Sequence, residues 1–266
     1  MATILSIRPQ VGLRLQKAAT PAESRDVARP IYAPREMALS ASLRGEDLER
    51  FESVKFASRV VRQGDHVFNA GDKFSCLYSI RGGCFKTSLP GSQGREQVTG
   101  FFMSGDLFGL DGLGGARYNV TAVALEDSTV WIMPYAVITA LAREVPSLQC
   151  SLDSELSREL ARSYGVMTLL GSTSAQERVA GFLLNLSRRH LRRGLSGSSF
   201  TLGMTRADIG NYLGITLETV SRTFSAFQAA GLIKVQQRAL SILDVEGLER
   251  ILETVRPKRG ARAGCS

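Results

Sequence analysis

Residues 205–228 of this 266-residue chain read TRADIGNYLGITLETVSRTFSAFQ. Thr205 and Thr216 each stand where a side-chain oxygen can cap the first turn of a helix. Gly214 lies between the two expected helices and permits the sharp turn that joins them. Two short capped helices around such a turn predict a helix-turn-helix, a motif that places its second helix in the major groove of DNA.

The second expected helix has two faces. Glu218, Ser221 and Arg222 fall together on one of them. These residue types suit base edges, because arginine donates two hydrogen bonds to guanine, glutamate accepts one from cytosine, and serine can meet a thymine edge. Glu218 and Arg222 also have the spacing of an ordinary surface salt bridge, and the capped framework favours DNA reading over that alternative. The other face is apolar and should pack inward, with Val220, Phe224 and Phe227.

Two short strands should follow this helix. Gly231-Leu-Ile-Lys-Val235 and Ala239-Leu-Ser-Ile-Leu243 flank Gln236-Gln-Arg238 and have the form of a β-hairpin wing. Another helix, expected over residues 175–193, presents Arg188, Arg189, Arg192 and Arg193 as phosphate contacts or, equally, as a solvated face. The candidate contacts to the DNA backbone are Thr205, Arg206, Thr216, Thr219, Arg188 and Arg189.

The net charge is concentrated in the last third of the chain. Residues 171–266 carry 14 Lys and Arg against 7 Asp and Glu, whereas residues 1–170 carry 19 against 18. Nearly all of the net charge of +8 therefore belongs to the part that contains the helix-turn-helix. A basic domain beside a neutral one indicates a polyanionic partner, with double-stranded DNA first and an anionic membrane surface second.

Short apolar runs between glycine turns characterise the middle of the chain. The runs cover residues 66–68, 77–80, 84–89, 97–102, 120–125 and 129–133, and a short helix is expected before them over residues 45–51. Glycines such as Gly71 and Gly83 stand in the turns, where they can supply a positive φ. Several strands at this spacing predict a closed antiparallel roll, not a parallel α/β sheet.

From about residue 137 to residue 170 the apolar residues adopt helical spacing, and Pro146 marks the first turn of a long helix. The apolar stripe is narrow and the outer face is polar. This favours a coiled-coil-like seam between two subunits over packing of the helix on its own roll, so a homodimer is expected. The expected dimer interface consists of Leu148, Leu152, Leu156, Leu160, Ser163, Met167 and Leu170.

The expected fold class is α+β, in five segments. Residues 1–38 form a poorly ordered extension, 39–145 a sensory β-roll domain, 146–170 the dimerisation helix, 171–256 a winged helix-turn-helix domain, and 257–266 a basic tail.

Other classes of function lack support in the sequence. No apolar stretch approaches the roughly 18 residues of a membrane helix, and the first residues have no secretory leader, so a cytoplasmic location without a membrane partner is expected. No GxSxG, P-loop, paired-histidine or Cys-His motif is present, so the chain is not expected to be an enzyme. The cysteines lack metal-ligand spacing and are expected to be structural thiols: Cys76, Cys84, Cys150 and Cys265.

The chain resembles the CRP/FNR family, the cyclic-AMP receptor protein and fumarate-nitrate reduction regulators, from about Gly45 to Leu252. Its resemblance is closest to the FNR branch and rests on Phe68-Asn-Ala-Gly-Asp72, Gln97-Val-Thr-Gly-Phe101, Ser104-Gly-Asp-Leu107, Asn185-Leu-Ser-Arg-Arg189 and Met204-Thr-Arg-Ala-Asp-Ile-Gly-Asn-Tyr-Leu-Gly214.

That resemblance implies an eight-stranded, cyclic-nucleotide-binding-like β-roll, a long dimerisation helix, and a C-terminal winged helix-turn-helix that activates or represses promoters. It assigns base reading to Glu218, Ser221 and Arg222 and implies a half-site similar to TTGAT. It also makes RNA polymerase a partner. The Ser92-Gln-Gly-Arg95 turn is a candidate contact for the polymerase, although a plain hairpin tip is the simpler interpretation.

Two departures from the family concern sensing. Cyclic-AMP binders have a Gly-Glu-Leu turn and an Arg-Ser pair that holds the cyclic phosphate, whereas this chain has Gly105-Asp106-Leu107 and Tyr118-Asn119 in those places, with only Arg117 nearby to touch an anion. Cyclic-nucleotide control is therefore not expected.

FNR proteins that sense oxygen hold a [4Fe-4S] cluster with three N-terminal cysteines and one later cysteine. This chain has no cysteine before Cys76, and Trp131 stands at the later position, so no cofactor is expected. Haem needs an axial ligand, and the only histidines are His66, which is more typical of a strand-end surface residue, and His190 in the DNA-binding half. The alternative is a cyclic-nucleotide- or haem-responsive regulator of the same fold.

Overall fold

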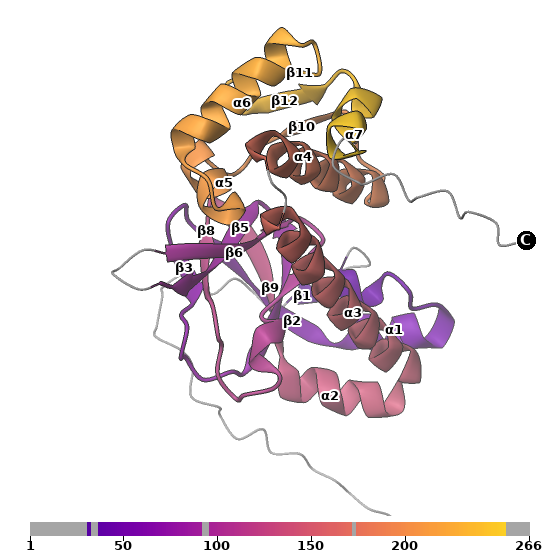
Figure 1. Cartoon of the computed structure of the whole chain (residues 1–266). Helices are drawn as coiled ribbons and strands as arrows, with labels where there is room; N and C mark the ends of the chain where they lie inside the picture. The colour runs from indigo at the N-terminus through magenta and orange to yellow at the C-terminus, as the bar shows by residue number, and fades with distance from the viewer. Residues whose placement is uncertain (1–30, 33–36, 92–95, 172–173, 254–266) are drawn as a thin grey trace, which may run out of the picture.

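The computed structural model describes residues 31–32, 37–91, 96–171 and 174–253. Most of the expected N-terminal extension, the basic tail and the turn at residues 92–95 lie outside the described residues. Figure 1 shows two bodies, a β-roll flanked by helices and a smaller helical domain with a three-stranded sheet, joined where a long helix ends.

Two sheets form the roll, which lies in the lower half of Figure 1. One has the order β1-β2-β9-β4-β7 and the other the order β3-β8-β5-β6, and neighbouring strands are antiparallel. This confirms the predicted antiparallel roll. The strands are β1 (Ile31–Tyr32), β2 (Lys55–Val61), β3 (His66–Phe68), β4 (Cys76–Gly82), β5 (Cys84–Pro90), β6 (Glu96–Met103), β7 (Leu107–Phe108), β8 (Thr121–Ala124) and β9 (Ser128–Pro134).

Aromatic rings fill the interior of the roll. The ring of Phe68 stacks on that of Tyr118 with centroids 3.9 Å apart, and Phe108 contacts Phe85 and Tyr78 at centroid distances of 5.2 and 5.4 Å. All five side chains are buried. Interdigitated aromatic packing of this kind makes a dense core, because each ring contributes a large apolar area.

The roll begins earlier in the chain than the expected boundary at residue 38. Ile31–Tyr32 forms strand β1 and pairs with Phe56 and Lys55 of β2. Met37 and Leu39 are fully buried in the core beneath the roll, around the short helix Ala38–Ser40. The prediction that residues 1–38 form a poorly ordered extension is therefore wrong at its C-terminal end, because two hydrogen-bonded residues and a buried methionine belong to the roll.

Three helices pack beside the roll (Figure 1): α1 (Gly45–Ser53), α2 (Tyr135–Glu144) and α3 (Pro146–Leu170). Helix α3 covers the range expected for the dimerisation helix, and Pro146 occupies its first turn. Leu148 and Leu152 are buried in a core with Phe51, Trp131 and Ile138 of the same chain. Their assignment to a dimer seam is therefore wrong: the first turns of α3 pack on their own roll.

The C-terminal body contains α4 (Ala175–Arg192), β10 (Ser199–Thr201), α5 (Arg206–Leu213), α6 (Leu217–Ala229), β11 (Ile233–Gln236), β12 (Ala239–Ile242) and α7 (Val245–Glu253). The strand order β10-β12-β11 confirms the hairpin form of the predicted wing, and β10 adds a third strand to it.

The core of the C-terminal body continues into the roll. Phe101 of β6 is buried, with its ring centroid 5.0 Å from that of Tyr212 on α5 and 6.0 Å from that of Phe182 on α4. Cys84 and Val98 of the roll belong to the same apolar cluster. The two bodies therefore share part of one hydrophobic core.

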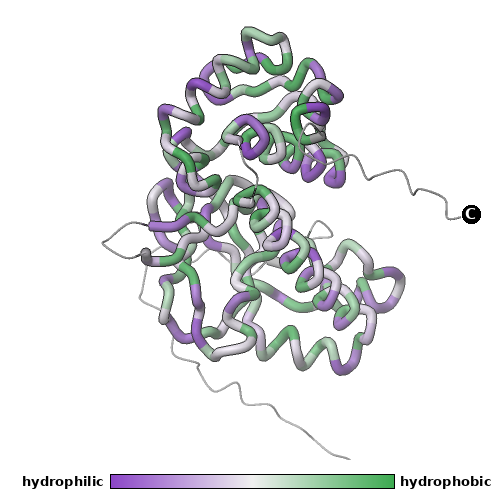
Figure 2. Tube along the Cα trace, in the orientation of Figure 1, coloured by the Kyte–Doolittle hydropathy of each residue, from purple (hydrophilic) through white to green (hydrophobic). Residues whose placement is uncertain are grey.

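No helix among the described residues is long and apolar enough to cross a membrane. Figure 2 shows hydrophilic and hydrophobic residues alternating along the helices, the pattern of helices with one buried face.

The shared core predicts how the two bodies unfold. Replacing Phe101 with alanine should cost about 3 kcal/mol and divide thermal unfolding into two transitions, because the substitution removes the ring that both bodies contact. Differential scanning calorimetry measures this. As a control, Phe85→Ala inside the roll should lower the transition without dividing it. A single transition at the wild-type temperature for Phe101→Ala would contradict the expectation.

Candidate nucleic-acid interface

Helices α5 and α6 adopt the predicted helix-turn-helix geometry. Thr205 forms a capping box with Asp208, in which each side chain accepts the backbone N–H of the other residue at 3.1 and 3.0 Å. Thr216 caps α6 by accepting the N–H of Thr219 at 3.2 Å. Gly214 has φ +63°, the left-handed conformation that glycine adopts without strain. The predicted caps and turn are confirmed.

The two helices approach closely at one glycine. A Cβ atom on Gly210 would lie 2.7 Å from the carbonyl oxygen of Ile215, in the turn itself. Only a residue without a side chain lets α5 pack this tightly on the start of α6, so Gly210 fixes the angle between the helices.

Helix α6 has one buried and one exposed face, as expected. Val220, Phe224 and Phe227 are buried, whereas Glu218 and Arg222 are exposed and Ser221 is half-buried. The Glu218 side chain accepts from its own backbone N–H and from Thr216, and with Arg222 these contacts lower its pKa. An ionised glutamate and an exposed guanidinium one turn apart form a surface that accepts and donates hydrogen bonds at adjacent positions.

The expected backbone contacts differ in exposure. Thr205 and Thr216 lie exposed at the helix starts, and Thr219 is half-buried. Arg206 stacks its guanidinium 3.6 Å from the ring centroid of Phe224, and burial lowers its pKa. Arg188 is exposed and pairs with Glu249 at 2.9 Å.

Arg189 does not belong to this interface. Its side chain is only 7% exposed and donates to the carbonyl oxygen of Phe101 and to the carboxylate of Asp106, both at 2.7 Å. The assignment of Arg189 to the DNA backbone is wrong, because its charge is already used inside the protein, against the roll. Arg193, a second candidate of that helix, also pairs with Asp106.

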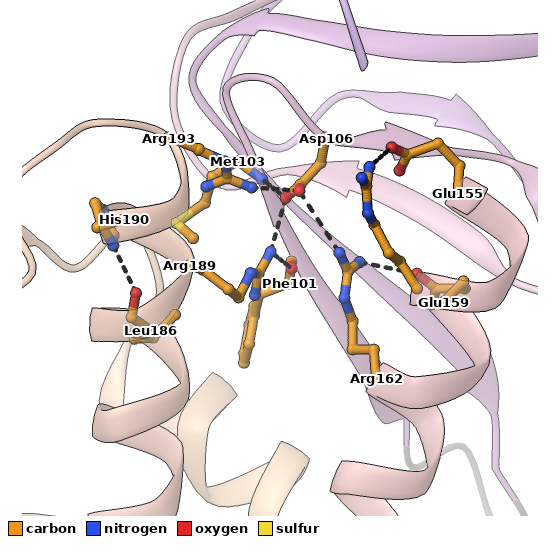
Figure 3. A network of polar contacts seen from close by, with 11 residues as sticks. Phe101, Met103, Asp106, Glu155, Glu159, Arg162, Leu186, Arg189, His190 and Arg193 are labelled. Carbon is orange, nitrogen blue, oxygen red and sulfur yellow. Dashed lines mark hydrogen bonds and ion pairs between the residues drawn. The ribbon is translucent and has the colours of Figure 1, made fainter. Parts of the chain in front are cut away.

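Asp106 is the centre of a polar network between the bodies (Figure 3). Arg189 reaches it from α4, Arg193 from the residue that follows α4, and Arg162 from α3 at 3.5 Å. The backbone N–H of Met103 donates to the same carboxylate at 2.8 Å. Burial alone would raise the pKa of Asp106, but the three guanidinium groups outweigh it and hold the pKa at about 2.

A second polar contact joins the β5–β6 hairpin to α5. The N–H of Val98 donates to the Asn211 side chain at 2.6 Å, and the Gln97 side chain donates to the Asn211 carbonyl oxygen at 2.8 Å. Lys86 pairs with Asp208 at 3.1 Å. The capping residue of α5 is therefore also a contact of the roll.

Comparison with known proteins agrees with this architecture. Residues 177–251 match the Crp-like helix-turn-helix domain, and residues 58–144 match the cyclic nucleotide-binding domain. The transcriptional regulatory protein btr of Bordetella pertussis is 41% identical over 76% of this chain and 83% of its own. The chain belongs to the CRP/FNR family of transcription regulators.

Two further proteins are similar to the chain. The fumarate and nitrate reduction regulatory protein of Escherichia coli K12 is 35% identical over 81% of this chain and 86% of its own. The solved structure of FixK2 from Bradyrhizobium japonicum matches with a TM-score of 0.68 and 28% identity, covering 74% of this chain and 97% of that one. As a CRP/FNR regulator, the chain carries its DNA-binding helix-turn-helix in α5 and α6.

The family's cyclic-nucleotide site does not fit the residues of this roll. Tyr118, which by the resemblance to the family takes the place of the phosphate-binding arginine, is buried against Phe68 and donates its hydroxyl to the carbonyl oxygen of Cys76 at 2.7 Å. Asn119 is bonded to Asp111, and Arg117 donates to the carbonyl oxygen of Gly71 at 2.5 Å. The interior of the roll between the two sheets is packed with aromatic rings.

The residues of this CRP/FNR member do not fit an iron-sulfur cluster either. Trp131, which by the resemblance to the family takes the place of the later cluster cysteine, is buried on β9. Cys76 and Cys84 begin two different strands and Cys150 lies on α3, and no group of metal-binding side chains occurs in the described part of the chain. Burial raises the pKa of the Cys84 thiol to about 12, which disfavours the thiolate that iron requires.

Neither histidine is placed as an axial ligand. His66 is exposed, with its Nδ1 atom 2.6 Å from the side-chain oxygen of Asn69. The ring of His190 stacks on Phe200 at a centroid distance of 4.6 Å, and its Nδ1 atom contacts the carbonyl oxygen of Leu186.

Sequence reasoning missed the Asp106 network. Asp106 and Arg189 are 83 residues apart, and both lie in short motifs shared with the FNR branch, Ser104-Gly-Asp-Leu107 and Asn185-Leu-Ser-Arg-Arg189. One motif carries an acidic residue and the other a basic one. This difference in charge is the only signal in the sequence that could have indicated a contact between them.

Asp106→Asn should destabilise the protein by about 3 kcal/mol at neutral pH, because it removes the buried carboxylate that three guanidinium groups share. The folded-state pKa lies below the ordinary value of 3.8, so the ionised carboxylate stabilises the protein above about pH 4 and loses this effect as the pH falls towards 2.

Urea unfolding at pH 7, 4 and 3 measures the difference between wild type and variant, which should shrink with pH. Asp65→Asn, an exposed aspartate of the same roll, should behave as wild type throughout. A difference independent of pH would show that the Asp106 charge does not act in this way.

Proposed function

We propose that this CRP/FNR regulator binds a TTGAT-like palindrome as a homodimer, with Glu218, Ser221 and Arg222 of each subunit reading the bases. The observation that carries the proposal is the exposed face of α6 on a doubly capped helix-turn-helix. Thr205, Arg206, Thr216, Thr219 and Arg188 are the proposed contacts to the DNA backbone. Lys234 and Arg238, exposed on the wing, add two cations that the sequence had not singled out.

The homodimer is proposed to form through the second half of α3. Leu160 and Met167 are 57% and 66% exposed, and Tyr164 and Leu170 are exposed beside them. These positions are three or four residues apart, so they line one face of the helix, and Ser163 lies exposed on it. Leu156 is half-buried against the roll core and marks where the seam would begin.

We further propose that the regulator acts in the cytoplasm, where bacterial promoters and RNA polymerase are found, without an iron-sulfur cluster or a cyclic nucleotide. RNA polymerase is the expected protein partner. The support for an independent mode of sensing is the chemistry of the roll, with Tyr118 and Trp131 filling the places of ligand-binding residues.

Arg222→Ala should abolish the preference for the guanine of the half-site, because one bidentate contact accounts for about 1–3 kcal/mol per half-site. Gel shifts on a TTGAT palindrome and on one with that guanine replaced measure the preference. Arg238→Ala on the wing is the control and should weaken both affinities alike, as expected for a phosphate contact. Wild-type discrimination by Arg222→Ala would refute the reading face.

Met167→Glu should convert the dimer to a monomer, because it places an uncompensated carboxylate in each half of the seam. Light scattering at micromolar concentration measures the mass. Ser154→Glu, exposed on the opposite side of α3, should remain dimeric. A wild-type protein that is monomeric under these conditions would contradict the proposed dimer.

Protein purified in air should contain no stoichiometric iron or acid-labile sulfide and should bind the palindrome equally well with and without oxygen. Metal analysis and gel shifts in an anaerobic chamber test both statements. Reconstitution with about four irons per subunit, together with air-sensitive DNA binding, would overturn the proposal.

A further inference from the structure

A cavity of about 970 Å³ lies between the roll, α3 and α4. Its walls come from β4, from the Ser104–Asp106 turn, from Trp131 on β9, and from the facing sides of the two helices. Cavities of this size hold small metabolites. The cavity is distinct from the aromatic interior of the roll, because the Asp106 carboxylate faces α3 and α4 whereas Tyr118 packs inside the roll.

Positive charge predominates around this cavity. Two carboxylates line it, those of Asp106 and Glu155. The carboxylate of Glu159 lies nearby and pairs with Arg162 at 2.9 Å. Six arginines line the same cavity: Arg81, Arg158, Arg162, Arg189, Arg192 and Arg193.

Two of the arginines have no carboxylate partner within the described residues. Arg192 is exposed at the end of α4, and Arg81 lies with its guanidinium 5.7 Å from the centroid of the Trp131 ring. Guanidinium groups bind carboxylate and phosphate through paired hydrogen bonds, so this excess of arginines suits an anion with more than one negative charge.

Buried polar atoms along the cavity lack partners. Arg189 is buried, yet its Nε atom has no hydrogen-bond partner in the described structure, because only its Nη2 atom reaches Phe101 and Asp106. The hydroxyl of Ser79 is also fully buried and unpartnered there. A buried donor without an acceptor is costly, and an oxygen-rich ligand would satisfy both.

We propose that this cavity binds a small multiply charged anion, a phosphate or polycarboxylate compound, as the effector of the regulator. Trp131, Met37 and Ile80 supply an apolar wall for the body of the ligand, and the arginines supply the anion contacts. Neither the aromatic interior of the roll nor the cysteines take part.

Binding at this place couples the roll to the DNA-binding body. Arg189 and Arg192 are on α4 and Arg193 directly follows it, whereas Arg81 and Asp106 are on the roll. An anion that draws guanidinium groups from Asp106 changes the contacts that hold α4 on the roll, and thereby the position of the helix-turn-helix. This second step rests on the proposed DNA-binding function, whereas the binding of the anion does not.

Trp131 is the only tryptophan of the chain, so its fluorescence reports on the cavity directly. The full-length protein is titrated with pyrophosphate and, separately, with citrate, while potassium chloride keeps the ionic strength constant. A saturable change with a dissociation constant below about 1 mM is expected for at least one of them. The anion that binds with the higher affinity shows whether the site prefers phosphate or carboxylate groups.

Arg81→Gln and Arg192→Gln should each weaken binding by about fivefold or more, because each removes a charged donor without exposing a buried acid. Arg188→Gln is the matched control, since Arg188 is on the same helix α4 but pairs with Glu249 away from the cavity. It should keep wild-type affinity for the anion. Because Arg81 contacts the fluorescent Trp131, replacing it can change the fluorescence itself. Isothermal titration calorimetry therefore measures the same affinities without using that signal.

A titration that stays flat with both anions would overturn the proposal. So would equal affinities for wild type, Arg81→Gln and Arg192→Gln, or an equal loss in all three variants including Arg188→Gln. Gel shifts with and without the bound anion then measure the coupling, and by linkage DNA must change the affinity for the anion by the same factor. Anion binding without any effect on DNA affinity would refute the effector role alone.

Discussion

The placement of the DNA-binding body depends on a buried ion cluster. A carboxylate on the roll, Asp106, is held by guanidinium groups from α3 and α4, and all of these groups lie near the junction of the two bodies. Removing such charges from water is expensive, so the cluster is stable only in the geometry that lets each guanidinium reach the carboxylate. Phe101 contributes twice to the same junction. Its carbonyl oxygen accepts a hydrogen bond from Arg189, and its ring packs against the ring of Tyr212.

This arrangement links the two bodies of the CRP/FNR regulator at more than one place. The roll, the long helix and α4 meet around Asp106, and α5 is bonded to the β5–β6 hairpin through Asn211. Both sets of contacts hold the C-terminal body against the roll. Tyr118 and Trp131, which by the resemblance to the family stand at its ligand positions, are both buried in the apolar clusters of the roll.

Much of the fold could be predicted from local patterns. The strands alternate with glycine turns, and the caps at Thr205 and Thr216 depend only on residues three positions apart. The errors occurred where a residue's partner is distant in the sequence. Leu148 and Leu152 have the spacing of a seam, and periodicity cannot show whether a helix stripe packs on its own roll or on another subunit. Arg189 was interpreted as a surface cation because its partner Asp106 is 83 residues away in the sequence. The strand Ile31–Tyr32 is too short to be recognised without the strand that it pairs with.

The junction also encloses a thiol. Cys84 belongs to the apolar cluster shared by the two bodies, and a Cβ atom on Gly203 of the C-terminal body would lie 2.8 Å from its sulfur. The backbone of one body thus covers the side chain of the other, and a reagent can reach this sulfur only after they separate. The rate at which Cys84 is alkylated in the native protein therefore measures how often the junction opens. This measurement needs no DNA, promoter or effector.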